Sequence, residues 1–135
     1  MKTLQGKRVL LGVSGGIAIY KSLSLLSLLN KQGAETEVIM TEGAKEFVTP
    51  MTFQTMSKHR VFDSIFSEED GFIPHIDLTR RNDVFLIAPA TANIISKIAN
   101  GLADDLLSSA ALASNIPIII SPAMNVYMYN NPATQ

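Results

Sequence analysis

The sequence predicts an α/β fold, a Rossmann-like three-layer sandwich in which a parallel sheet is flanked by helices. Four short apolar runs alternate with segments of helical spacing, and the connections between them are short. Each apolar run ends in a turn of small or polar residues. Parallel strands need crossover connections, and the helices of those connections cover both faces of a sheet. We therefore expect buried strands whose turns gather at one edge.

The first half of the chain predicts two strands and two helices. Arg8–Val13 is an apolar run that ends in a glycine-rich turn, and apolar residues then recur at helical spacing over 17–30. Residues 34–40 predict a second buried strand, and a short helix is expected over 50–57. Acidic residues mixed with scattered aromatic residues over 61–72 indicate an irregular surface segment.

The second half predicts two more strands and two more helices. Residues 84–88 form a buried strand that Pro89 ends, because proline has no N–H for a central ladder. Helical spacing begins at Ile94 and again over 104–114. Residues 116–120 give the last apolar strand.

Composition limits the class of protein. The 135 residues are 47% apolar, which predicts one globular domain over 1–135. Eleven basic and twelve acidic residues form no basic block, which argues against nucleic acid and membrane surfaces as partners. The chain has no cysteine, which excludes disulfides and thiolate metal sites. We expect a cytoplasmic protein, since glycines interrupt the first apolar run before it reaches signal-peptide length.

Four turns should form the ligand site. In an open parallel sheet, ligands bind at the carboxyl ends of the strands. The turns there read VSGG, MTEG, PATAN and SPAMN. The PATAN turn precedes a helix whose first N–H groups can hold a phosphate or the electron-rich edge of a heterocycle. The first turn matches neither the dinucleotide fingerprint nor the triphosphate loop, because its glycine spacing differs and no G-K-[ST] follows.

Three segments resemble the flavoprotein family of cysteine decarboxylases. They are GVSGGIAIYK at 12–21, HIDL at 75–78 with APATANIISKIANGLADDLLS at 88–108, and PAMNVYMYNNPAT at 122–134. The resemblance is greatest to the amino-terminal part of the bifunctional coenzyme A biosynthesis enzymes, which decarboxylates 4′-phosphopantothenoylcysteine to 4′-phosphopantetheine. It implies a carboxy-lyase that binds FMN without a covalent bond near a subunit boundary, in a trimer or a trimer-based dodecamer.

The resemblance also implies residue roles. His75 would be the active-site histidine, and Asn125 would hold the substrate carboxylate. The remaining matched positions would bind the cofactor: Gly15, Gly16, Ile17, Thr41, Gly43, Thr91, Ala92, Asn93, Ile94 and Ala123. In the implied reaction, oxidised FMN takes a hydride from the carbon that bears sulfur, and the resulting thioaldehyde accepts the electron pair when CO₂ leaves.

Several alternatives stay open. Isolated glycines are more often plain turn residues, isolated asparagines are commonly caps, and Asp104 and Asp105 fit capping charges at a helix start. A flavin prenyltransferase, a peptidyl-cysteine decarboxylase, a non-catalytic flavin-binding regulatory protein and a non-flavin nucleotide binder are the rival functions. Family members that release a fully reduced product carry a cysteine beyond the PAMN segment. We therefore expect this chain to be an amino-terminal fragment that binds FMN and turns over poorly.

Overall fold

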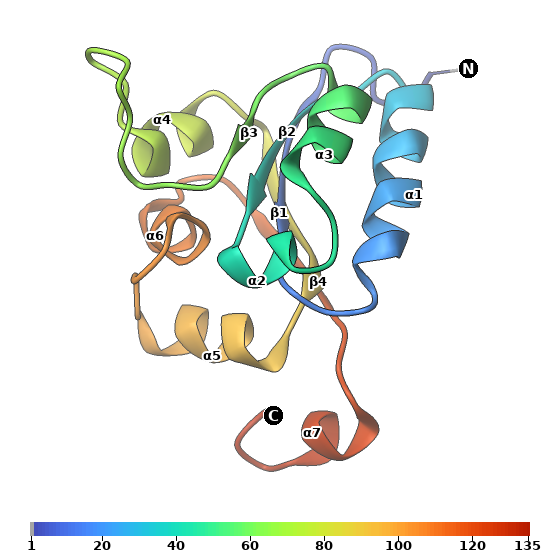
Figure 1. Cartoon of the computed structure of the whole chain (residues 1–135), viewed down its shortest axis with the longest axis vertical. Coiled ribbons are helices and arrows are strands. Elements are labelled where there is room, and N and C mark those ends of the chain that lie inside the picture. The colour runs from blue at the N-terminus through green and yellow to red at the C-terminus, as the bar shows by residue number, and fades with distance from the viewer. Residues whose placement is uncertain (1) are drawn as a thin grey trace.

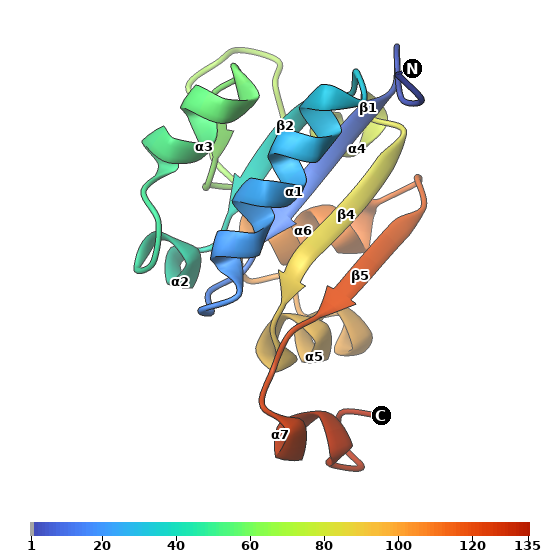
Figure 2. The same ribbon diagram turned by 90° about the vertical axis from the view of Figure 1, so that its right-hand side faces the viewer.

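The computed structural model describes residues 2–135 and shows a parallel sheet between two layers of helices (Figure 1, Figure 2). The five strands are β1 Arg8–Val13, β2 Glu35–Met40, β3 Val61–Phe62, β4 Val84–Ala90 and β5 Ile118–Pro122. The helices are α1 Ile19–Lys31, α2 Glu42–Lys45, α3 Pro50–Ser57, α4 Pro74–Arg80, α5 Ala92–Asn100, α6 Leu106–Ala113 and α7 Val126–Asn130. The predicted Rossmann-like three-layer sandwich is confirmed.

The sheet has the strand order β3-β2-β1-β4-β5, and all of its pairs are parallel. The chain moves outward from β1 through β2 to β3 and then returns to the other side of β1 with β4. Strand order therefore reverses between β1 and β4. In such sheets the crevice at the carboxyl ends of the two strands is where ligands bind.

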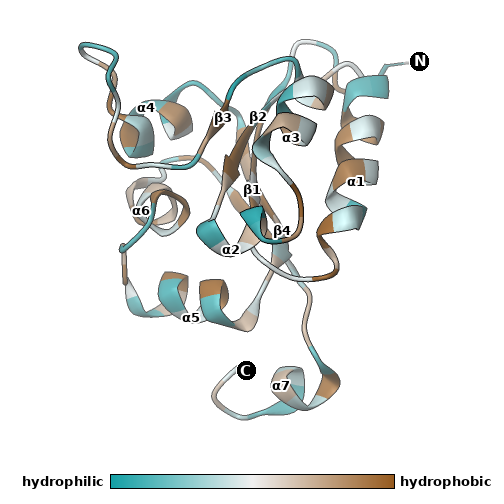
Figure 3. Ribbon diagram, viewed as in Figure 1, coloured by the Kyte–Doolittle hydropathy of each residue, from teal (hydrophilic) through white to brown (hydrophobic). Residues whose placement is uncertain are grey.

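Alternate residues of the strands pack into two separate hydrophobic cores. Leu11 and Val38 point to the face that α1, α2 and α3 cover, where Phe53 of α3 is fully buried. Leu10 and Phe85 point to the opposite face, which α4, α5 and α6 cover. Figure 3 shows the hydrophobic colour concentrated on the strands between these helix layers. Burial on both faces explains why β1 and β4 read as nearly continuous apolar runs.

The prediction that Pro89 ends its strand is wrong, because β4 continues to Ala90. The ladder with β5 is irregular between Ile87 and Ala90, and Pro89 falls in that irregular part. The missing N–H is therefore not required there. The Pro89 carbonyl is used instead, and it accepts hydrogen bonds from the amide and hydroxyl of Ser14.

Two further predictions need correction. Helix α1 begins at Ile19 rather than at 17, and Ile17 is 78% exposed, so the predicted apolar face is only partly buried. The segment predicted as irregular begins with β3, which pairs with β2 and buries Phe62. The sequence predicted no element for the HIDL segment, which lies within α4. The helix predicted over 50–57 is confirmed as α3.

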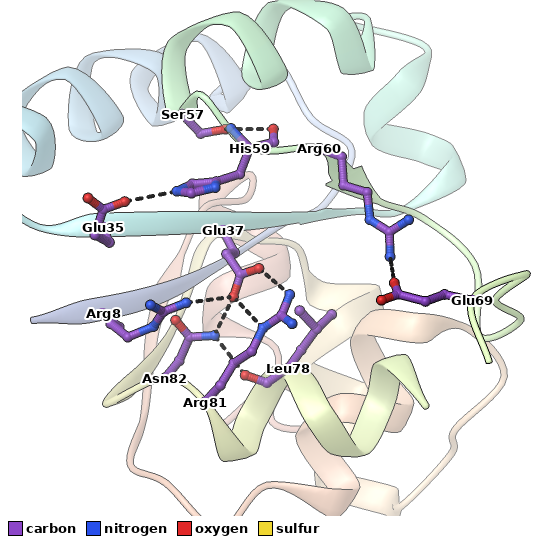
Figure 4. A network of polar contacts seen from close by, with 10 residues as sticks. All are labelled: Arg8, Glu35, Glu37, Ser57, His59, Arg60, Glu69, Leu78, Arg81 and Asn82. Atoms are coloured by element: carbon purple, nitrogen blue, oxygen red, sulfur yellow. Dashed lines mark hydrogen bonds and ion pairs between the residues drawn. The ribbon is translucent and has the colours of Figure 1, made fainter. Parts of the chain in front are cut away.

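A buried carboxylate organises the amino end of the sheet (Figure 4). Glu37 of β2 is 5% exposed, and its carboxylate accepts hydrogen bonds from Arg81 Nε at 2.9 Å, from Arg81 Nη2 and from Asn82 Nδ2 at 3.1 Å. Arg8 Nη2 lies 3.8 Å from the same carboxylate. Asn82 also donates to the Leu78 carbonyl in the last turn of α4 at 2.7 Å. The network therefore fastens the end of α4 to the sheet.

Within residues 2–135, no helix is long and apolar enough to span a membrane. No group of three or more His, Asp or Glu side chains in that range is arranged to hold a metal ion.

Candidate functional site

A cavity of about 790 Å³ opens at the carboxyl end of the sheet, and we call it the large cavity. The turns after β1, β2, β4 and β5 meet around it. Every predicted cofactor residue and the predicted substrate residue line it: Gly15, Gly16, Ile17, Thr41, Gly43, Thr91, Ala92, Asn93, Ile94, Ala123 and Asn125. The four turns, which we call the corners after β1, β2, β4 and β5, therefore converge as expected. The contacts of these residues with a ligand stay predictions.

The corners after β1 and β2 touch through their main chains. A Cβ atom built on Gly15 would lie 2.6 Å from the Gly43 carbonyl carbon and 2.7 Å from its oxygen. No real Cβ contact is that short, so a side chain at Gly15 would force the two corners apart. Gly16 differs, because a Cβ there would meet only Thr91 Cγ2 at 3.8 Å.

Ser14 fastens the β1 corner to the β4 corner. The residue is 3% exposed, and its hydroxyl donates to the Pro89 carbonyl at 2.6 Å. The same oxygen accepts a hydrogen bond from the Thr91 amide at 3.1 Å. Ser14 belongs to the predicted VSGG turn, but this role was not predicted from the sequence.

Four successive backbone amides in the turn after β1 have no acceptor among the described residues. Within residues 2–135, the N–H groups of Gly15, Gly16, Ile17 and Ala18 donate to no backbone or side-chain atom. Three of these residues are small, and all four line the large cavity. A run of unpaired main-chain donors beside a cavity is suited to an anionic group such as a phosphate.

Three predicted site residues are helix caps. The Thr41 hydroxyl accepts from the Ala44 amide at 3.1 Å, and the Thr91 hydroxyl accepts from the Ile94 amide at 3.3 Å. Asn125 Oδ1 accepts from the Tyr127 amide at 2.8 Å. Each side chain keeps a donor group for a ligand, because a hydroxyl can still donate its hydrogen and an amide its Nδ2 hydrogens. The capping interpretation and the binding interpretation are therefore compatible.

A charged cluster lies in the wall on the α5 side. Lys97 Nζ is 2.9 Å from Asp104 Oδ1 and 3.0 Å from Asp105 Oδ2. Its hydrogen bond to Asp104 is the main reason that the pKa of Lys97 is raised. Burial alone would raise the pKa of Asp105, but hydrogen bonds from Ser108 and Lys97 outweigh burial and lower it. The pair is thus fully charged near neutral pH.

Asp105 is the N-cap of α6, as the capping interpretation predicted. Its carboxylate accepts from the Ser108 amide at 2.7 Å, and the Ser108 hydroxyl accepts from the Asp105 amide at 3.2 Å. This capping box fixes the carboxylate that holds Lys97. Asp104 is the second partner of Lys97 and is not the N-cap of any helix within residues 2–135, so the capping prediction does not hold for it.

His75 does not line the large cavity of its own chain. It lies in the first turn of α4, a helix that sits beside α6 and away from α7 (Figure 1). Its Nδ1 atom is buried and has no hydrogen-bond partner among the described residues. The structure therefore brings the other predicted site residues together and leaves His75 apart from them.

Residues outside the prediction also line the cavity: Ser14, Ala18, Glu42, Pro89, Lys97, Asp105, Met124 and Met128. Lys97 could have been found from spacing, because it follows Asn93 by four residues on the same helix and so shares its face. Met124 lies inside the SPAMN turn. Glu42 is likewise part of the MTEG turn.

The cavity fits a planar heterocycle that carries a phosphate. Its volume lies in the usual range for cofactor sites. Gly15, Gly16 and Gly43 have no side chains, so the main chain itself forms this part of the wall. The unpaired amides at 15–18 offer donors for the phosphate, and Ala92, Ile94 and Ala123 offer apolar walls for the rings.

Comparisons with known proteins agree with this geometry. A family model described as Flavoprotein matches residues 1–135. The coenzyme A biosynthesis bifunctional protein CoaBC of Bacillus subtilis (strain 168) is 50% identical over 98% of this chain. The chain spans 33% of the length of that relative.

Two solved structures share the fold over nearly the whole chain. The FMN-dependent cysteine decarboxylase SpaF superposes with a TM-score of 0.92 at 31% identity, covering 98% of this chain and 77% of SpaF. A mutant PPC decarboxylase complexed with pantothenoylaminoethenethiol superposes with a TM-score of 0.83 at 32% identity. That match covers 95% of this chain and 72% of the other.

Proposed function

The chain belongs to the Flavoprotein family, and on that premise we propose that it binds FMN and decarboxylates 4′-phosphopantothenoylcysteine to 4′-phosphopantetheine in coenzyme A biosynthesis. The identity to CoaBC and the likeness to a PPC decarboxylase support this substrate. The observation that carries the proposal is the convergence of four corners on one cavity with unpaired amides. A generic nucleotide binder does not account for the PAMN turn beside it.

The cavity residues divide into two groups for the cofactor. The amides of 15–18 and the Thr41 hydroxyl would hold the phosphate and ribityl chain. Residues 91–94 would hold the ring system, with Ala123 against its face. Bound FMN supplies the electron sink that a simple cysteine carboxylate lacks.

Asn125 is suited to hold the substrate carboxylate. Its Oδ1 is committed to the Tyr127 amide at 2.8 Å, which directs the Nδ2 hydrogens elsewhere. A neutral amide binds a carboxylate without pairing it with a full positive charge, so the carboxylate stays free to leave as CO₂. Met124 and Met128 form apolar walls that limit water at this point.

His75 would act on the cavity of a second copy. It lies outside the cavity of its own chain, and α7 exposes Val126, Tyr127 and Tyr129 beside that cavity. Exposed apolar residues in one short helix are typical of a protein interface. We therefore propose a homo-oligomer, a trimer or a trimer-based dodecamer, in which His75 of one copy serves the cavity of its neighbour.

One experiment tests cofactor and chemistry separately. The purified protein should be yellow, should release FMN on denaturation, and should release CO₂ from 4′-phosphopantothenoylcysteine. His75→Asn should stay yellow and lose at least about 100-fold in CO₂ release, which is within the range for an acid–base group. His59→Asn is the matched control, since His59 pairs with exposed Glu35 at 2.9 Å. A colourless protein, or full activity in His75→Asn, would refute the proposal.

A further inference from the structure

A second cavity of about 320 Å³ lies on the α1 side of β4 and β5, and we call it the side cavity. It shares Ala18, Pro89 and Ala123 with the large cavity. The two cavities are therefore neighbours that have these three residues in common in their walls. The proposed function uses only the large cavity.

Two chain segments contribute residues to the walls of both cavities. Ser121 lines the side cavity, Ala123 lines both, and Asn125 lines the large cavity. Along α1 and the turn before it, Ile17 lines the large cavity and Lys21 the side cavity. A long, flexible molecule bound at Asn125 can therefore follow the 121–125 segment from one space into the other.

The two cavities differ in charge. The large cavity has two acidic side chains, Glu42 and Asp105, and its one lysine, Lys97, is paired with Asp104 and Asp105. The side cavity has Lys21 and no acidic side chain. Within residues 2–135, no carboxylate lies within 4.0 Å of Lys21 Nζ. The unpaired positive charge of Lys21 therefore favours an anionic group in the side cavity.

We propose that the side cavity binds the phosphate monoester of the substrate, with Lys21 Nζ as the cation and the Ser121 hydroxyl as a second donor. Lysine binds phosphate as a point charge, and the hydrogen bonds are charge-assisted. Ser22 is part of the wall only, because its hydroxyl already donates to the Ala88 carbonyl at 2.7 Å. This assignment rests on the proposed function, and it places the two ends of the substrate at Asn125 and at Lys21.

A phosphate monoester could come from the substrate or from FMN. The unpaired amides at 15–18 lie in the large cavity and suit the cofactor phosphate, which leaves Lys21 for the substrate. The test must therefore measure both. The probes are 4′-phosphopantetheine and pantetheine, which differ only in the phosphate, and FMN and riboflavin, which differ in the same way.

The experiment is calorimetric titration of the Lys21→Met variant. The dissociation constant of 4′-phosphopantetheine for the FMN-loaded protein should rise about ten-fold, the scale of one charge-assisted hydrogen bond. The dissociation constant of pantetheine should not change, and neither should the ratio of the dissociation constants of FMN and riboflavin. Lys31→Met is the matched control, because Lys31 is exposed at the far end of α1 and lines neither cavity. This control should bind all four ligands as the parent does.

Other outcomes overturn the inference. Lys21→Met could instead weaken FMN binding and leave unchanged the ratio of the dissociation constants of 4′-phosphopantetheine and pantetheine. In that case Lys21 binds the cofactor phosphate. If neither ratio changes, the side cavity binds no phosphate. A parent protein that binds no flavin would instead refute the proposed function, and so the two failures are distinguishable.

Discussion

At the amino end of the sheet, the buried Glu37 carboxylate accepts hydrogen bonds from Arg81 and Asn82, whereas at the carboxyl end the amides of 15–18 donate to nothing in residues 2–135. The first end satisfies its polar groups with side chains, and the second leaves main-chain donors beside a cavity. Satisfied groups hold elements in place, and unsatisfied groups are available to a ligand. We call the amino end of the sheet, with its satisfied polar groups, the fastening end. We call the carboxyl end, with its unpaired amides, the binding end.

The largest effect is expected from adding a side chain at the binding end. Gly15→Ala places a Cβ 2.6 Å from the Gly43 carbonyl carbon, so the two corners must separate. We expect FMN affinity to fall at least about 100-fold, equivalent to about 2.7 kcal/mol, measured by fluorescence titration.

Gly16→Ala is the matched variant, because its Cβ meets only Thr91 Cγ2 at 3.8 Å. It should lose less than about ten-fold in FMN affinity. Equal losses in the two variants would show that the close contact between Gly15 and Gly43 is not what shapes the site.

Removing the charge at the fastening end should affect stability and leave binding intact. Glu37→Gln puts amide hydrogens against the Arg81 and Asn82 donors. We expect the free energy of unfolding in urea to fall by about 2 kcal/mol, less than for a fully enclosed pair because the Arg81 side chain is 41% exposed.

The FMN affinity of the folded Glu37→Gln protein should equal that of the parent. Glu69→Gln removes an exposed partner of Arg60 and should change stability by less than about 0.5 kcal/mol. A Glu37 variant that folds normally and loses FMN would contradict the separation of the two ends.

The smallest effect concerns Asp105, a satisfied charge at the binding end. The pKa of Asp105 is lowered in the folded chain, so its stabilisation is present above the ordinary aspartate pKa of about 4 and is lost as pH falls through the folded value. Asp105→Asn keeps an oxygen for the Ser108 amide and removes this dependence.

Urea unfolding between pH 6 and pH 3 checks this prediction. The stability difference between the parent and Asp105→Asn should be largest at pH 6 and should shrink toward pH 3. Asp70→Asn changes an exposed side chain in the 63–73 loop and serves as the control. A difference that grows as the pH falls would contradict the pKa direction.

The sheet and its four corners were predictable because both follow from local patterns. Apolar runs define strands, and parallel strands bring their carboxyl ends to one edge. Pro89 was mispredicted because the rule for proline assumes a regular ladder, and the irregularity between Ile87 and Ala90 depends on how β5 pairs. The strand β3 was missed since two residues carry too little periodicity.

The contacts that hold the site together were beyond local patterns. Ser14 reaches Pro89 and Thr91, which are 75 and 77 residues away in sequence, and no spacing rule pairs them. The position of His75 depends on how α4 packs against the rest of the chain, which a sequence motif does not specify. Lys97, by contrast, could have been predicted as a site residue from its spacing to Asn93 on α5.

The close approach of Gly15 to Gly43 has a consequence for how this site can be mapped. Gly15, Gly16, Gly43, Ala92 and Ala123 carry a methyl group or nothing beyond the main chain. An alanine scan removes atoms, and at these positions there are almost none to remove. Such a scan would assign importance to the caps and charges and would miss the surface that a flat ligand touches, which only substitutions that add volume can reveal.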